Sequence, residues 1–238
     1  MSSKVKGRPS AEDWRGDPLP RGRHKLDVLT VRASQRERLI RSMLETVARR
    51  GYEAMTVPEV VATARVSRNA FYEFFTDKTD CFLAACDEQA SDLLRTVQAF
   101  AGKPDWIESM RRSVHAYLQW WAERHAFARA YFIGLPAAGE RALEQRERSY
   151  DLFADNFAQA ARNARAENPA LPPLPPRVPM MLVRATTEMI AAEVRGDRTE
   201  RLLDLEDDLV FIAVKLLADD ATAARTLPDR GATVEPRG

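Results

Sequence analysis

Apolar positions recur at helical spacing along most of the chain, and no segment shows the alternation of a strand. The first apolar stripe runs over residues 39–48 and follows Ser34 and Glu37, which have the spacing of a capping box. Gly51, after two arginines, is typical of a helix end. We therefore expect order to begin at Ser34 and the fold to be all-α, with about nine helices.

Two short helices and a long one are predicted next. Thr56 and Glu59 repeat the capping box before a helix that ends near Ala64. After a three-residue turn, Ser67 caps a helix over residues 68–74, and Thr76 or Asp77 caps the long helix that begins near residue 78. Two short helices joined by a tight turn have the outline of a helix-turn-helix, which we place in a domain over residues 34–80.

The rest of the chain is predicted to be a second helical domain over residues 81–221. Aromatic and aliphatic residues share one face over 106–121 and another over 150–161. Six prolines in residues 169–179 predict a loop, for which an interhelix linker is favoured over a partner-binding motif. The last predicted helix, 201–218, is apolar over so wide a surface that burial on more than one side is expected. Residues 222–238 are expected to form a flexible tail.

Charge is divided unevenly along the chain. Residues 1–78 carry 16 basic and 10 acidic side chains, whereas the remaining 160 residues carry 20 and 25. Residues 1–33 lack periodicity and are predicted to be a disordered basic arm, in which Arg21 and Arg23 lie in the densest positive stretch. A basic front on a mildly acidic body is typical of a nucleic-acid reader with a separate second module.

The helix predicted over residues 68–74 has the side chains of a recognition helix. Arg68 and Asn69 are suited to bidentate contacts with guanine and adenine, and Ala70 is small enough to meet a thymine methyl. Phe71 and Phe75, four residues apart, are expected to point back into a three-helix core. These residue types at the start of a short helix favour reading of the DNA major groove.

The stretch from Gly51 to Lys78, with its run of aromatic residues at 71, 72, 74 and 75, resembles the DNA-binding domain of the TetR family. The resemblance covers about fifty residues of the sequence. It implies that Tyr72 and Lys78 contact phosphates and that the start of the helix predicted over residues 68–74 contacts bases. It also implies that the start of the preceding helix, at Thr56 and Val57, approaches the DNA backbone. The predicted DNA-binding residues are Thr56, Val57, Ser67, Arg68, Asn69, Ala70, Tyr72, Phe74 and Lys78, with Arg21 and Arg23 from the arm; minor-groove entry by the arm stays open.

One position departs from the family pattern. Arg65 stands in the turn where the family usually has glycine. If this residue is left-handed, its side chain costs roughly 1–2 kcal/mol, and a different turn geometry is the alternative.

The resemblance also implies a homodimer with a ligand pocket in each body. The predicted ligand-binding residues are Trp106, Met110, Val114, Tyr117, Trp121, Tyr131, Tyr150, Phe153, Phe157, Met181 and Met189, although such a stripe is more often plain core. The predicted dimer residues are Leu182, Leu202, Leu205, Leu209, Phe211, Ile212 and Leu216. A largely apolar ligand is favoured.

These features favour a dimeric repressor that a small hydrophobic ligand releases from a palindromic operator. A DNA-binding regulator controlled by a protein partner is the alternative. An enzyme is disfavoured because no nucleophile–base pair or phosphate-cradling loop is recognisable, and the scattered histidines predict no metal and no cofactor. Two cysteines on different helix faces and the lack of a long apolar run favour a cytoplasmic protein.

Overall fold

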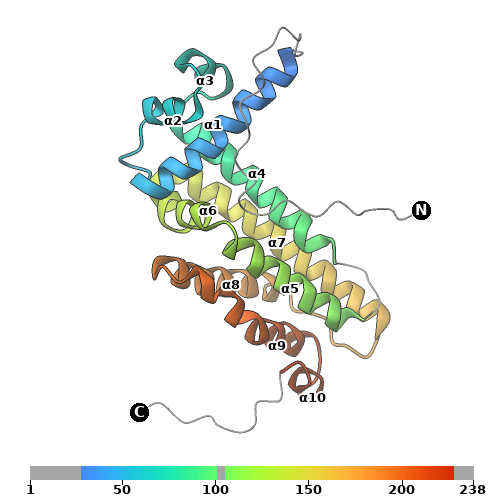
Figure 1. Ribbon diagram of the computed structural model, residues 1–238. Helices are drawn as coiled ribbons and strands as arrows, with labels where there is room; N and C mark the ends of the chain where they lie inside the picture. Colours follow the sequence, from blue (N-terminus) through green and yellow to red (C-terminus); the bar gives the residue numbers. More distant parts are fainter. Residues whose placement is uncertain (1–27, 101–104, 228–238) are drawn as a thin grey trace, which may run out of the picture.

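The computed structural model describes residues 28–100 and 105–227, and over these ranges the expected all-α fold is confirmed (Figure 1). The described α-helices are α1 (Val28–Arg50), α2 (Val57–Ala64), α3 (Arg68–Phe74), α4 (Lys78–Gln98), α5 (Trp106–Ala122), α6 (His125–Arg129), α7 (Glu140–Glu167), α8 (Val178–Arg195), α9 (Glu206–Leu217) and α10 (Asp220–Ala224). Three shorter elements join them: the π-helix η2 (Ala130–Gly134) and the 3-10 helices η3 (Leu135–Ala138) and η4 (Thr199–Leu205).

Helices α1, α2 and α3 form a small head at one end of the molecule (Figure 1). Its core is built from fully buried side chains of all three helices, including Met43, Val60 and Phe71. Gly51 ends α1 with a φ of 78°, as its place after two arginines predicts. Asp77 rather than Thr76 caps α4, because its carboxylate accepts from the Asp80 amide at 2.7 Å.

Helix α1 begins at Val28, six residues earlier than expected. The predicted capping box at Ser34 is therefore wrong, because Ser34 lies inside the helix. Arg32 is held in this first part by its ion pair with Glu73 at 2.6 Å and by the ring of Phe74, 5.0 Å below its guanidinium. Packing against α3 thus extends the helix upstream of its sequence signal. Residues 1–27 of the predicted arm, with Arg21 and Arg23, lie outside the described residues.

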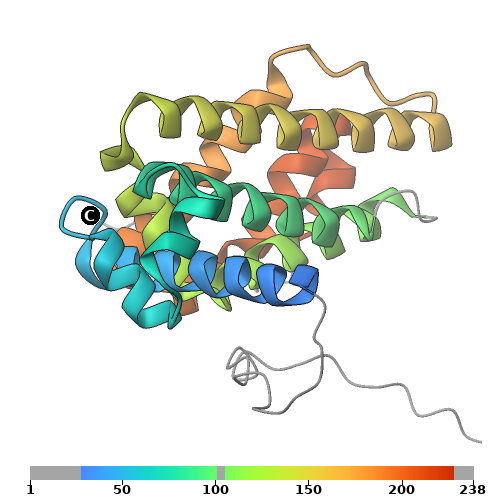
Figure 2. The ribbon, with the colours of Figure 1, turned by 90° about the horizontal axis from the view of Figure 1, so that it is seen from above.

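The head is joined to the body by α4 and by the packing of α1 on α6 and η2. Helix α4 packs against α1 on one side and against α7 on the other, and it lies between them in the view from above (Figure 2). Gly134, in η2, meets α1 so closely that a Cβ there would lie 2.7 Å from the Val47 Cγ1 atom. Only glycine permits this approach of helix to helix.

Helices α8, α9 and α10 lie at the end of the body away from the head, and α5 and α7 extend toward them from the middle of the molecule (Figure 1). The chain enters α9 through η4, so the helix predicted over residues 201–218 is not continuous. A 3-10 helix turns every three residues, which changes the direction of the side chains before Glu206. As a result Leu202 lies fully buried inside the protomer.

The predicted flexible tail is wrong for residues 222–227. The carboxylate of Asp219 caps α10 by accepting from the Thr222 amide at 2.7 Å. Ala223 is fully buried against α9, and Thr226 is 7% exposed. This short helix therefore belongs to the body.

Candidate functional site

Contacts at its N-terminal end position helix α3. The Ser67 hydroxyl accepts from the Ala70 amide at 3.1 Å, as the sequence predicts for an N-cap. The turn before it is left-handed at Arg65, with φ 53° and ψ 44°, so the family's glycine is replaced without a change of geometry. The Arg38 guanidinium of α1 donates to the carbonyls of Ala64 and Arg65 at 3.1 and 3.4 Å and fixes the turn.

Three of the predicted DNA contacts stand on the exposed side of α3. Arg68 and Asn69 are exposed in its first turn, and Tyr72 is 47% exposed one turn later. The Arg68 guanidinium lies 5.7 Å from the centre of the Tyr72 ring, within the range of a cation–π contact. Tyr72 is held edge-on against the buried Phe71. The arrangement presents two hydrogen-bonding side chains and a ring to the solvent.

Two predicted contacts are not placed for that role. Ala70 is only 8% exposed and packs in the core of the head, so its methyl is not presented to a base. The Lys78 ammonium donates to the carbonyls of Tyr52, Glu53 and Met55 at 3.1, 3.3 and 3.2 Å. Because an ammonium has three donors, none is left for a phosphate in this arrangement. Lys78 instead ties the start of α4 to the loop after α1.

The remaining predicted residues of the head surround α3. Thr56 is exposed at the start of α2, where the Glu59 carboxylate accepts from its amide and its hydroxyl, both at 3.1 Å. These hydrogen bonds lower the pKa of Glu59. Val57 and Phe74 are half-buried. Sequence reasoning missed Arg38, whose only signal is its place on α1 directly before the first buried leucine, Leu39.

The body has a partly open cavity of about 160 Å³ between α5, α7, α8 and α9, next to the end of α4, which we call the outer chamber. Of the predicted ligand-binding residues, Trp106, Met110, Val114, Tyr117, Phe153 and Phe157 line it. The sequence did not identify the other lining residues: Val97, Ser109, Ser113, Asn156, Gln159, Ala160, Asn163, Glu167, Leu182, Val183, Thr186, Leu209 and Ala213. Several lie three or four residues from a predicted one, so helical spacing could have found them.

A second, smaller cavity of about 20 Å³, the inner chamber, adjoins it. Tyr117, Phe153 and Val183 line both chambers, and the rings of Tyr117 and Phe153 meet edge to face at 5.8 Å between centres. Three further predicted residues, Trp121, Tyr131 and Tyr150, line the inner chamber alone. The two chambers therefore form one divided cavity with an aromatic partition.

The phenols of the inner chamber are kept protonated by burial. Burial raises the pKa of Tyr117 to about 12, and it also raises the pKa values of Tyr131 and Tyr150. Each hydroxyl therefore remains a neutral donor at physiological pH. The guanidinium of Arg184 lies 5.1 Å from the centre of the Tyr150 ring and forms an ion pair with Glu147.

Some residues predicted to bind the ligand are exposed outside the cavity, and some residues predicted at the dimer interface line it. Met181 and Met189 line neither chamber and are 62% and 39% exposed on α8. Leu182 and Leu209 were predicted at the dimer interface, but both line the outer chamber. The fully buried Leu202 is likewise unavailable to a partner.

The other predicted dimer residues differ in exposure. Ile212 is 45% exposed, and Leu205, Phe211 and Leu216 are half-buried. The exposed apolar side chains of α8 and α9 are therefore Met181, Met189 and Ile212.

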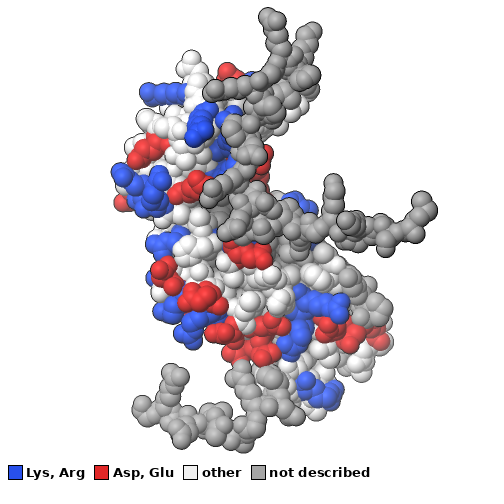
Figure 3. All heavy atoms as spheres, viewed as in Figure 1, with Lys and Arg blue, Asp and Glu red and all other residues white. Residues whose placement is uncertain are grey.

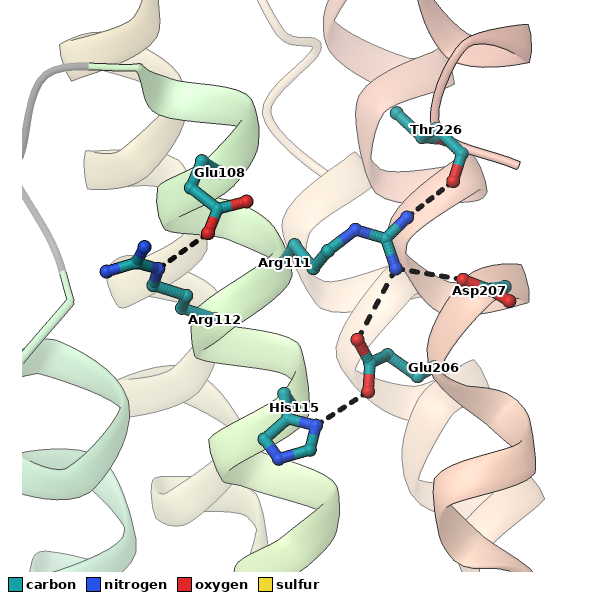
Figure 4. Close-up of polar contacts among 7 residues, drawn as sticks. All are labelled: Glu108, Arg111, Arg112, His115, Glu206, Asp207 and Thr226. Carbon is teal, nitrogen blue, oxygen red and sulfur yellow. Dashed lines mark hydrogen bonds and ion pairs between the residues drawn. The ribbon is translucent and has the colours of Figure 1, made fainter. Parts of the chain in front are cut away.

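Polar contacts fix α5 against α9 and α10 beside the outer chamber (Figure 4). The Arg111 guanidinium donates to Glu206 at 3.4 Å and Asp207 at 2.8 Å, and it also contacts the Thr226 carbonyl. The His115 imidazole lies 2.7 Å from the second Glu206 oxygen. Because the two carboxylates stand in the first turn of α9, they also favour the helix dipole. The network holds the wall that carries Met110.

Charged side chains of both signs are scattered over the visible face of the head and of the body, with uncharged areas between them (Figure 3). Within residues 28–100 and 105–227, no three His, Cys, Asp or Glu side chains gather as a metal site. No helix in the same ranges is long and apolar enough to cross a membrane.

Comparisons with known proteins agree with this geometry. Residues 39–85 match the family model described as "Bacterial regulatory proteins, tetR family", which spans the head and the start of α4. No curated protein matches the chain.

Solved structures of transcriptional regulators share the fold over most of the chain. FadR from Bacillus subtilis, solved in complex with stearoyl-CoA, has a TM-score of 0.67 at 16% identity, over 76% of this chain and 99% of its own. FadR from Bacillus halodurans, a fatty acid degradation regulator, gives 0.68 at 15% identity, over 76% and 99% of the two chains. A tetR-family regulatory protein from Rhodococcus RHA1 gives 0.61 at 20% identity, over 78% and 98%. The head therefore has the helix-turn-helix of the tetR family model that residues 39–85 match, and the chain shares the overall fold of these regulators.

Proposed function

We propose that this regulator is a homodimeric repressor that releases its operator when a small, largely apolar molecule enters the divided cavity. The cavity itself is the observation that supports the proposal most strongly. Its outer chamber is walled by apolar side chains of four helices and edged by the polar side chains of Ser113, Asn156 and Thr186. An apolar chamber with a few polar groups is the usual form of a small-molecule site.

The exposed apolar side chains of the last helices support the homodimer. Met181, Met189 and Ile212 are exposed on α8 and α9, two helices that lie in the part of the body away from the head (Figure 1). A two-fold dimer through this surface would present α3 twice to the DNA, which requires a palindromic site. In this proposal Arg68 and Asn69 read bases, while Tyr72 and the exposed start of α2 contact the backbone.

The experiment begins with selection of an operator from random DNA by the purified full chain. Operator affinity is then measured by fluorescence anisotropy with and without stearoyl-CoA and a panel of smaller apolar compounds. A ligand that acts should weaken DNA binding about 5- to 150-fold, and operator DNA should weaken ligand binding by the same factor. If no compound alters operator affinity, control by a protein partner becomes the better explanation.

A cavity-filling variant tests where such a ligand acts. Val114→Trp should bind the operator as wild type does but lose the response, because the new ring occupies the outer chamber. Gln119→Trp, on the exposed side of the same helix, is the matched control and should keep the response. An unchanged response in Val114→Trp would place the ligand elsewhere.

Arginine substitutions in the proposed interface test the dimer. Met181→Arg and Ile212→Arg should shift the protein toward monomer in sedimentation velocity and weaken operator binding, since each places a charge in the proposed interface. Leu152→Arg is the control because Leu152 is also apolar and 54% exposed, but on α7. A wild-type monomer at micromolar concentration contradicts the proposal.

A further inference from the structure

The inner chamber carries a buried donor that the fold leaves unused. Trp121 is 4% exposed, and its indole nitrogen has no hydrogen-bond partner within the described residues. The Tyr117 hydroxyl interacts with this nitrogen and with the Thr187 side chain, but the indole N–H and the phenol oxygen do not meet hydrogen-bond geometry. A buried N–H without an acceptor is costly, so such a group in a cavity wall points to a ligand atom.

The indole ring cannot turn away to find another partner. Trp121 stacks on Phe127 with the rings 8° from parallel, and it also packs edge-on against Trp120. Phe132 contacts it at 4.7 Å between ring centres. The position of the N–H is therefore fixed by aromatic packing, and any acceptor has to come to it.

The charge of the chamber decides which acceptor fits. Its lining residues include Ser149 and Thr187, whose hydroxyls donate to the carbonyls of Gln145 and Val183 on their own helices. No lining residue is charged among those described. The guanidiniums of Arg146 and Arg184 lie 5.9 and 5.1 Å from the centre of the Tyr150 ring but do not line the chamber, so a carboxylate would have no charged partner in its wall, at high cost. A neutral carbonyl oxygen has two lone pairs, which match the indole N–H and the protonated Tyr117 hydroxyl once that hydroxyl turns from Thr187 to the ligand.

We infer that the ligand carries a neutral carbonyl oxygen at one end, which enters the inner chamber and accepts from Trp121 and Tyr117, while its apolar body fills the outer chamber. The inference rests on the proposed function of the body as a ligand-binding domain. The chamber volumes of about 20 and 160 Å³ match this division into a small polar end and a larger apolar part. The rings of Tyr117 and Phe153, which line both chambers, flank the passage.

Two probes with one skeleton test this inference. 4-Phenyl-2-butanone and butylbenzene differ in a single carbonyl, and their dissociation constants are measured by ligand-observed NMR and calorimetry on the wild-type chain and on Trp121→Phe. The preference for the ketone over the hydrocarbon should fall about tenfold in the variant, the worth of one hydrogen bond from a buried donor. Val114→Ala, in the outer chamber, should weaken both probes and leave the preference unchanged.

A second measurement does not depend on a variant that keeps the fold. In wild-type protein labelled with ¹⁵N-tryptophan, the Trp121 indole resonance, assigned by its loss in Trp121→Phe, should move downfield with the ketone and not with the hydrocarbon. Tyr117→Phe should reduce the ketone preference by a smaller factor, since the indole donor remains.

The outcomes separate the inference from the proposed function. Equal ketone preference in wild type and Trp121→Phe, or an indole resonance that responds alike to both probes, overturns the inference and leaves a ligand-binding body intact. Failure of both probes to bind wild type also overturns it, because a chamber with this lining should accept the ketone. A ketone that binds through Trp121 but never alters operator affinity supports the inference and contradicts ligand-controlled repression.

Discussion

The head and the body differ in how they treat buried polar groups. In the described part of the head, buried polar side-chain atoms have partners: Lys78 is bound by three carbonyls, and the Tyr52 hydroxyl lies 2.6 Å from that of Thr79. The body instead leaves buried polar atoms of Trp121, Gln145 and Arg146 without partners among the described residues.

The head and the body also differ in how tightly their cores are packed. The head is filled by side chains, whereas the body core is interrupted by two chambers. The proposed function accounts for this difference, since it requires a head that keeps one shape and a body that is completed by another molecule. A saturated, close-packed domain presents α3 in a fixed geometry, and an unsaturated one has free energy to gain on binding.

The largest effect that tests this comparison is loss of a ring. Phe71→Ala should lower the free energy of unfolding by about 3–5 kcal/mol, because the fully buried ring leaves a void in a solid core. Phe153→Ala should cost less than about 3 kcal/mol, since this ring already borders both chambers. Denaturant unfolding of the two variants checks the order, and equal losses would contradict the difference in packing.

Raising the pH above 10 should lower the stability of the body through Tyr117. Its pKa is raised to about 12, so it contributes stability below pH 10, and this contribution is lost as the pH rises to about 12. Wild type should lose about 2–3 kcal/mol more than Tyr117→Phe across this window. Unfolding by urea at pH 9, 10, 11 and 12 measures the difference, and parallel curves would show that the hydroxyl is not buried in solution.

Lys78→Met should lower the free energy of unfolding by about 2 kcal/mol, because three carbonyls lose a charged donor. The loss should appear in thermal unfolding without DNA, and operator affinity should fall alongside it. Tyr72→Phe is the contrasting variant, since its exposed hydroxyl should affect DNA binding alone. If Lys78→Met keeps its stability and the slope of log operator affinity against log salt concentration falls by about one, Lys78 contacts a phosphate as the sequence predicts.

The smallest expected effect is a gain in stability. Arg65→Gly should stabilise the head by about 0.5–1 kcal/mol, the relief of a left-handed side chain less the added freedom of glycine in the unfolded chain. Arg65→Ala keeps the strained Cβ and should give no such gain. A loss of stability in Arg65→Gly would show that the arginine side chain itself holds the turn.

The sequence predicts the head better than the cavity, for physical reasons. Ser67 and Gly51 act within one turn of the chain, and their roles as helix cap and helix end are visible in the local pattern. The fate of Lys78 depends on carbonyls more than twenty residues away, which no local pattern shows. The start of α1 was missed for the same reason, because Arg32 is held by α3.

In the body, the error was one of helical phase. The predicted dimer stripe assumed an unbroken α-helix through Leu202 and Leu209, but η4 turns the chain before α9 begins. Leu209 therefore faces the outer chamber. On α8, before this break, Leu182 also lines the chamber, while Met181 stays in solvent. Periodicity identifies an apolar face well but does not say which neighbour covers it, and the choice between ligand wall and partner surface needs the tertiary arrangement.

The π-helix η2 has a consequence for how this chain is compared with its relatives. A π turn holds one residue more than an α turn, so it is equivalent to a one-residue insertion into a regular helix. Deleting one residue from Ala130–Gly134 would rotate the following backbone by about 100° and carry Gly134 away from Val47. Relatives with an uninterrupted helix here should align with a single-residue gap, and a larger side chain should be tolerated where this protein requires glycine.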